Sequence, residues 1–158
     1  MTQLGRHLVL LSVLLATATP SYAQAPVITV DGLTVHPIQY GELLFSTIVP
    51  DAPPLPDGSH GELWRFEGTA GDCAEITMRG ELLDALLVLH YAAPVGDYIA
   101  VDDDSFGGMA AQILKRLPET GPYYIIATSA AGRPRTGDYW LRLRQVERCT
   151  TERLPIDD

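Results

Sequence analysis

The sequence is poor in positive charge. It has 158 residues, with 11 lysines and arginines against 20 aspartates and glutamates, and its formal net charge is −9. Nucleic-acid binding depends on clustered basic residues, and so does attraction to anionic lipid. The composition therefore argues against nucleic-acid and membrane-surface partners. It is compatible with cation binding, although acidity mostly serves solubility.

The motifs of common catalytic sites are absent as well. The sequence contains no G-x-S-x-G elbow and no HExxH motif. His36, His60 and His90 are scattered, and Ser105 would need a general base that the sequence does not identify. His90 lies in an apolar run, which predicts a strand residue at the edge of a sheet. We predict that the protein is not an enzyme, with a small secreted hydrolase as the alternative.

No apolar run is long enough to cross a membrane. The run at residues 8–16 is much shorter than the roughly 20 residues that a spanning helix needs. It follows Arg6 and His7, and the small residues Ser21 and Ala23 stand at positions −3 and −1 before Gln24. We therefore predict a signal peptide cleaved before Gln24. The mature protein is predicted to be soluble, either periplasmic or secreted, and not inserted in the membrane.

Cysteine is scarce, and the only two are Cys73 and Cys149. An even pair in an exported protein is a disulfide candidate. The alternative is a pair of buried free thiols, and metal binding is disfavoured because no His or Cys lies at ligand spacing. We predict a disulfide, which in the chain-entropy model stabilises the fold by roughly 4 kcal/mol.

Glycine and proline, in contrast, are spread along the chain in the way that frequent turns require. Between them, residues 73–79 alternate with the period of a half-buried strand. The face predicted to point into the core carries Ala74, Ile76 and Met78. Strict alternation places Cys73 on the opposite, polar face.

Seven or eight such strands are predicted, with no helix after the signal peptide. Their residues are 38–49, 62–67, 73–79, 85–91, 98–101, 110–117, 123–129 and 139–143. Helix is the alternative for residues 81–90, because leucine and alanine favour it, but nearby glycine and proline limit its length. The pattern predicts an all-β fold, an antiparallel β-sandwich or jelly roll.

Residues 117–143 are predicted to form a β-hairpin around which the sandwich is built. The predicted units of the chain are a signal peptide, an N-terminal arm or short hairpin, a β-sandwich domain and a polar tail, at residues 1–23, 24–37, 38–149 and 150–158. The proline-rich residues 50–61 are predicted to form a long surface loop.

The order of short motifs between residues 38 and 146 resembles the bacterial pre-peptidase C-terminal domain, a jelly-roll β-sandwich related to collagenase collagen-binding domains. The motifs are YGE at 40–42, LWRF at 63–66, AGD at 70–72, ITM at 76–78, LDALLVL at 83–89, DDD at 102–104, LPETGPYYI at 117–125 and GDYWL at 137–141. The resemblance implies a non-catalytic module that usually accompanies a secreted peptidase and aids secretion, substrate binding or solubility. A free-standing copy would be an accessory or binding module.

The densest acidic cluster, Asp102 to Asp104, predicts a calcium site that Asp84 could join. The alternative is a solvated acidic turn in which one aspartate caps backbone amides. The related collagen-binding domains imply a different calcium site near Glu62 and Asp57. Their acidic N-terminal linker is missing here, since residues 27–37 contain only Asp31.

Two further motifs have competing interpretations. Residues 117–121, LPETG, match a sortase recognition pentapeptide, but no membrane-length apolar segment follows, so we predict a turn before a strand. Trp140 alternates with core-facing neighbours and is predicted to be exposed beside Arg142 and Arg144, as a binding surface. The alternative is plain cross-strand packing.

The predicted partner is an extracellular or envelope protein or a polysaccharide. A carbohydrate-binding jelly roll is the second hypothesis. An exposed strip of aromatic residues would favour it, and burial of those residues would count against it. The aromatic residues in question are Trp64, Tyr123, Tyr124, Tyr139 and Trp140.

Overall fold

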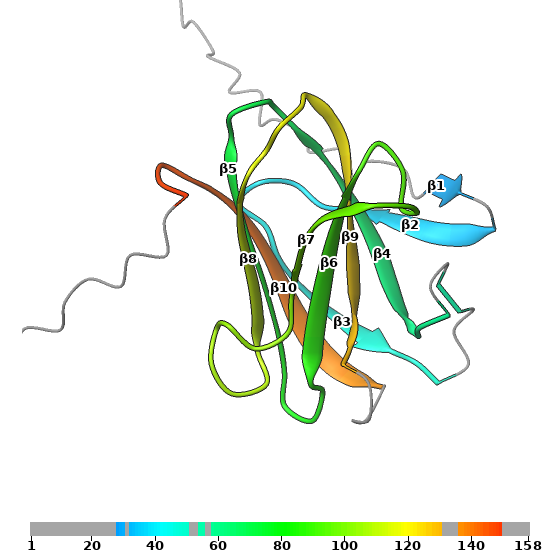
Figure 1. The fold of residues 1–158 in the computed structure, drawn as a ribbon. Coiled ribbons are helices and arrows are strands. Elements are labelled where there is room, and N and C mark those ends of the chain that lie inside the picture. Colours follow the sequence, from blue (N-terminus) through cyan, green and yellow to red (C-terminus); the bar gives the residue numbers. More distant parts are fainter. Residues whose placement is uncertain (1–27, 31, 51–53, 56–57, 131–135, 150–158) are drawn as a thin grey trace, which may run out of the picture.

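A computed structural model describes residues 28–30, 32–50, 54–55, 58–130 and 136–149. They form ten strands, and the prediction of an all-β sandwich is confirmed (Figure 1). The strands are β1 Ile28–Val30, β2 Leu33–Pro37, β3 Leu43–Ile48, β4 Gly61–Gly68, β5 Cys73–Gly80, β6 Ala85–Tyr91, β7 Tyr98–Asp102, β8 Ala111–Arg116, β9 Gly121–Ser129 and β10 Gly137–Val146. The predicted signal peptide and C-terminal tail lie outside the described residues.

The strands make two sheets that pack face to face. One sheet has six strands in the order β1-β2-β4-β9-β6-β7, and the other has four in the order β3-β10-β5-β8. Alternation along β5 explains the packing, because Ala74, Ile76 and Met78 are fully buried between the sheets, as predicted. All strand pairs are antiparallel except β2 with β4. The N-terminal hairpin β1-β2 thus joins the six-stranded sheet through a parallel pairing of β2 with β4.

The predicted hairpin at residues 117–143 is wrong. β9 pairs with β4 and β6, whereas β10 pairs with β3 and β5 in the opposite sheet. The residues from Tyr123 to Ser129 are all buried, because β9 is a central strand covered on both faces. Turn residues between two strands show where the chain reverses, but they do not show whether it stays in the same sheet. Of the turn predicted between residues 129 and 139, residues 131–135 lie outside the described residues.

A second cluster of apolar residues covers the outer face of the six-stranded sheet. Its members are Val35, Leu55, Leu63, Tyr124 and Ile126. Leu55 belongs to the proline-rich segment that was predicted to be a surface loop, and its amide donates to the carbonyl of Ser59 at 2.8 Å. The described part of that segment therefore packs one apolar side chain onto the sheet.

His90 lies inside the six-stranded sheet, and its predicted position at a sheet edge is wrong. It belongs to β6, which pairs with β9 on one side and with β7 on the other, and it is buried.

Across the described residues we find no helix with the length and apolar character needed to cross a membrane.

Candidate functional site

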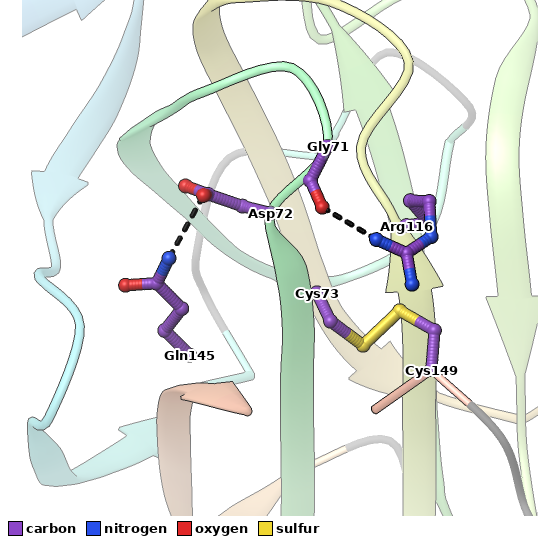
Figure 2. Close-up of a disulfide and its surroundings, with 6 residues drawn as sticks. All are labelled: Gly71, Asp72, Cys73, Arg116, Gln145 and Cys149. Atoms are coloured by element: carbon purple, nitrogen blue, oxygen red, sulfur yellow. Dashed lines mark hydrogen bonds between the residues drawn. A yellow bond between two sulfur atoms is a disulfide. The ribbon is translucent and has the colours of Figure 1, made fainter. Parts of the chain in front are cut away.

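The predicted disulfide is confirmed. Cys73 is the first residue of β5, and its side chain lies on the outer face of the sheet. It forms a disulfide with Cys149, and the two Cα atoms are 5.5 Å apart (Figure 2). Two polar contacts flank it: Arg116 donates to the carbonyl of Gly71 at 2.8 Å, and Gln145 donates to Asp72 Oδ1 at 2.8 Å. The bond ties the segment after β10 to the first residue of β5.

The acidic residues predicted to bind calcium are distributed over the fold. Asp102 ends β7, where its Oδ2 accepts hydrogen bonds from the amides of Gln112, at 2.7 Å, and Ser105, at 3.2 Å. Asp103 and Asp104 are exposed, and Asp84 precedes β6. Glu62 lies on β4, which β9 and β6 separate from β7.

No group of three or more His, Cys, Asp or Glu side chains is arranged to hold a metal within the described ranges. Asp102 makes the backbone contacts that the capped-turn alternative requires. The calcium site stays a prediction, and Asp57 lies outside the described residues.

Replacing Asp102 with alanine should lower the free energy of unfolding by about 1–2 kcal/mol, because two backbone amides lose their acceptor. Chemical denaturation measures this loss. Repeating it with calcium and with a chelator also tests the calcium prediction. Exposed Asp103→Ala is the matched control and should change stability by less than about 0.5 kcal/mol. Equal stability of Asp102→Ala and wild type would contradict the capping role.

A polar network lies at one end of the core, where the two sheets meet. The hydroxyl of Tyr139, on β10, donates to Glu62 Oε2 on β4, and the indole Nε1–H of Trp64 donates to that hydroxyl at 3.0 Å. Burial raises the pKa of Tyr139, and the Glu62 carboxylate raises it further. The tyrosine therefore stays protonated and holds the carboxylate in a defined orientation.

Two other tyrosines, the half-buried Tyr40 and the buried Tyr123, behave in the same way. Burial and the nearby Asp72 carboxylate raise the pKa of Tyr40 to about 12. Burial raises the pKa of Tyr123 too. Three phenols in the folded protein thus resist ionisation.

We expect the stability of the protein to fall as the pH rises from about 10 to 12, because unfolded tyrosine ionises near pH 10. Above that pH the unfolded state binds fewer protons than the folded state, so the free energy of unfolding decreases. Denaturation at fixed pH, with tyrosinate absorbance as the second readout, measures the effect. Tyr40→Phe should flatten the slope, and an unchanged slope in that variant would contradict the assignment.

The outer face of the four-stranded sheet carries an aromatic pair, of which one ring is exposed and the other is half-buried. The register places Trp140 of β10 directly between Phe45 of β3 and Arg79 of β5. Phe45 is 79% exposed, and Trp140 is half-buried. With Leu82, which is 77% exposed, these side chains line a groove of about 850 Å³. We call it the Phe45–Trp140 groove.

The two arginines predicted to accompany Trp140 contact an acidic residue instead. Arg144 donates to Glu75 Oε1 from Nε at 3.0 Å and from Nη2 at 2.7 Å, and Arg142 lies 3.4 Å from the same oxygen. The Arg142 guanidinium also lies 5.8 Å from the centre of the Trp140 ring, at cation–π distance. Arg79 forms no ion pair in the described part of the chain, so it is the basic group beside the groove that is left for a ligand.

Sequence analysis missed Phe45, Arg79 and Leu82 as members of this surface. β3 reads LLFSTI, and both of its faces carry apolar residues, so alternation alone does not show which face is exposed. The pairing of Phe45 with Trp140 would have identified the exposed face of β3. That pairing joins strands that are far apart in the sequence, so it cannot be read from local alternation.

Four of the five aromatic residues considered for a binding strip are buried. They are Trp64, Tyr123, Tyr124 and Tyr139. Their burial counts against a sugar-binding strip formed by that set. Only Trp140 of the five reaches the surface.

No protein-family model and no curated protein matches the chain. Solved structures share its fold, among them the two that follow. The pre-peptidase C-terminal domain of a collagenase from Bacillus anthracis is 15% identical, with a TM-score of 0.57 over 71% of this chain and 96% of that one. PliG from Aeromonas hydrophila, a periplasmic lysozyme inhibitor of g-type lysozyme, is 14% identical, with a TM-score of 0.52 over 71% of this chain and 97% of that one. The resemblance predicted from the sequence motifs is thus confirmed in three dimensions: the chain has the fold of a pre-peptidase C-terminal domain.

Proposed function

We propose that the protein is an exported, non-catalytic binding module that holds a protein partner in the Phe45–Trp140 groove. The disulfide and the predicted signal peptide support export. The fold is shared with the pre-peptidase C-terminal domain of a collagenase and with a periplasmic lysozyme inhibitor, and neither description names a catalytic domain.

The observation that carries the proposal is the exposure of Phe45 beside Trp140. A phenylalanine that is 79% exposed on a flat sheet face leaves most of its apolar area in water. Exposed apolar area that gathers next to a groove marks interaction sites, and Trp and Arg are the residues most enriched among binding hot spots. Phe45, Trp140 and Arg79 combine these features in one row across three strands.

The geometry favours a protein over a polysaccharide as partner. β3 is an edge strand of the four-stranded sheet, and among the described residues no strand pairs with its outer side. An extended segment of a partner could add to this edge through main-chain hydrogen bonds while its side chains enter the groove. Arg79 offers a guanidinium to a carboxylate on that segment, although Glu81 and Asp138 also line the groove. The inhibitor PliG is by its description also a protein that acts on a protein.

The hydrolase alternative has weaker support. His36 Nε2 and Glu62 Oε1 lie 3.9 Å apart, which is beyond hydrogen-bond distance. The described residues that line the small pocket beside them include two threonines but no Ser or Cys, and the hydroxyl of Thr47 donates to Asp138 at 2.6 Å rather than to His36 or Glu62. This arrangement gives little support to a hydroxyl nucleophile activated by His36.

Site-specific photo-crosslinking tests the proposal. A photoreactive phenylalanine is introduced at position 45, and the protein is expressed with its predicted signal peptide in its native host. Tyr98 on β7 serves as the exposed control position. We expect one discrete protein adduct from position 45 and none from position 98. Arg79→Ala and Trp140→Ala should each weaken binding of that protein at least tenfold, since hot-spot losses reach about 2 kcal/mol or more.

Either of two results would overturn the proposal: adducts of equal yield from the two positions, or binding of the adduct protein that the variants leave unchanged. A glycan array with the wild type and Trp140→Ala tests the polysaccharide alternative. Glycan binding that depends on Trp140, without a protein adduct, would replace the protein partner with a carbohydrate.

A further inference from the structure

A second cavity lies beside the polar network; it shares Thr47 with the Phe45–Trp140 groove but is not lined by Phe45 or Trp140. It has a volume of about 130 Å³ and is lined by Leu33, Thr34, His36, Thr47, Val49, Leu55, Gly61, Glu62 and Leu63. A cavity of roughly 150 Å³ accommodates benzene, whereas drug-sized ligands need roughly 300 Å³ or more. This pocket therefore suits one side chain or a similarly small molecule.

The pocket has one anionic group, the Glu62 carboxylate. Its side chain is only 19% exposed, and one of its oxygens accepts from Tyr139. The other oxygen faces His36 Nε2 at 3.9 Å, which is too far for a hydrogen bond. Among the described residues no lysine or arginine pairs with Glu62. With only His36 at 3.9 Å and no lysine or arginine beside it, this largely buried carboxylate has part of its desolvation cost uncompensated.

The surrounding residues define which cation would fit. His36 packs against Trp64 with ring centroids 5.0 Å apart, so its imidazole is held in place at the wall of the pocket. The hydroxyls of Thr34 and Thr47 offer further acceptors. The remaining side chains of the wall are aliphatic: Leu33, Val49, Leu55 and Leu63. A calcium ion needs six or more oxygen ligands, and this set does not supply them.

We infer that this pocket binds a primary ammonium group on an aliphatic stem, the chemistry of a lysine side chain. The ammonium pairs with Oε1 of Glu62, the oxygen that faces His36, and the stem lies against the leucine and valine side chains. Tyr139 contributes as a positioning residue, because its hydroxyl orients the carboxylate from the core side. The inference is independent of the proposed function, since Phe45, Trp140 and Arg79 do not line this pocket.

Nuclear magnetic resonance titration with n-butylammonium chloride tests the inference on the whole mature protein at pH 8. We expect saturable shifts in the methyl resonances of Leu33, Val49 and Leu55 and in the His36 ring. n-Butanol has the same stem without charge, and tetramethylammonium has the charge without N–H donors. Neither compound should produce saturable shifts in these resonances.

The charge on Glu62 is tested by Glu62→Gln, which should weaken n-butylammonium binding at least tenfold. Glu67→Gln is the matched control, because it removes a carboxylate from the same strand at a position that is 62% exposed and paired with Arg65. It should leave binding unchanged. If Glu62→Gln does not fold, the comparison of the three small molecules on the wild type still decides the question.

Nα-Acetyl-lysine methylamide then identifies the source of the ammonium. Affinity at least equal to that of n-butylammonium supports a lysine of a protein partner, and markedly weaker affinity supports a free amine. Equal binding of n-butanol and n-butylammonium, or equal binding by wild type and Glu62→Gln, would overturn the inference.

Discussion

Removal of the Cys73–Cys149 disulfide should lower the free energy of unfolding by about 4 kcal/mol. The two cysteines are 76 residues apart, and closing so long a loop restricts the unfolded chain strongly. A loss of this size corresponds to a decrease in melting temperature of roughly 10–20 °C. Thermal unfolding of Cys73→Ala/Cys149→Ala, compared with the oxidised wild type, measures the effect.

The double variant also provides the control for reduction. Dithiothreitol should destabilise the wild type to about the level of the variant and should not affect the variant itself, since the described residues contain no free cysteine. A loss below about 1 kcal/mol would show that contacts such as Arg116 with Gly71 already fix this end of the sheet. The groove should persist in the folded variant, because Trp140 lies six residues along β10 from Val146, the register partner of Cys73, roughly 20 Å away.

Replacing Tyr123 with alanine should lower the free energy of unfolding by about 4 kcal/mol. The ring is fully buried and stacks on Phe66, with centroids 5.3 Å apart, and it contacts Tyr91 at 5.1 Å. Its hydroxyl donates to the carbonyl of Glu119 at 2.7 Å and accepts from the amide of the same residue at 3.2 Å. One side chain thus fills the core and closes the turn before β9.

Tyr123→Phe separates these two contributions. It keeps the ring and removes the hydroxyl, so the expected loss is about 1 kcal/mol. Tyr91→Phe serves as the control: Tyr91 is half-buried, and among the described residues its hydroxyl bonds only to the carbonyl of Thr120, at 3.2 Å. Denaturant unfolding measures all three variants. Equal losses for Tyr123→Phe and Tyr123→Ala would contradict a packing role for the ring.

The Tyr123 contacts also explain the LPETG motif. Leu117 is 1% exposed, and its amide and carbonyl bond to Asp72 and Gly71. The motif is therefore a turn whose first residue, Leu117, is buried and fixed to the start of β5, whereas Pro118, Glu119 and Thr120 are exposed. The turn interpretation is thus supported.

Sequence by itself determined the class of fold and the faces of several strands. Apolar residues at a period of two mark the core side of β5, because a strand directs alternate side chains to opposite faces. The bounds of β6 were predicted exactly as residues 85–91, and helix was the wrong alternative there. The scarcity of cysteine and the predicted export led to the disulfide, because an oxidising compartment pairs the only two thiols.

Only the tertiary structure decided which strands lie side by side. β9 and β10 are adjacent in sequence but lie in different sheets. Each contributes buried side chains to the core from its own side of the sandwich. Both candidate binding sites depend on such long-range placement: Phe45 meets Trp140 across β3 and β10, and Glu62 meets Tyr139 across the two sheets. Local alternation shows which side of a strand a residue occupies. The neighbour that it meets there depends on strand order, which packing of the whole core decides.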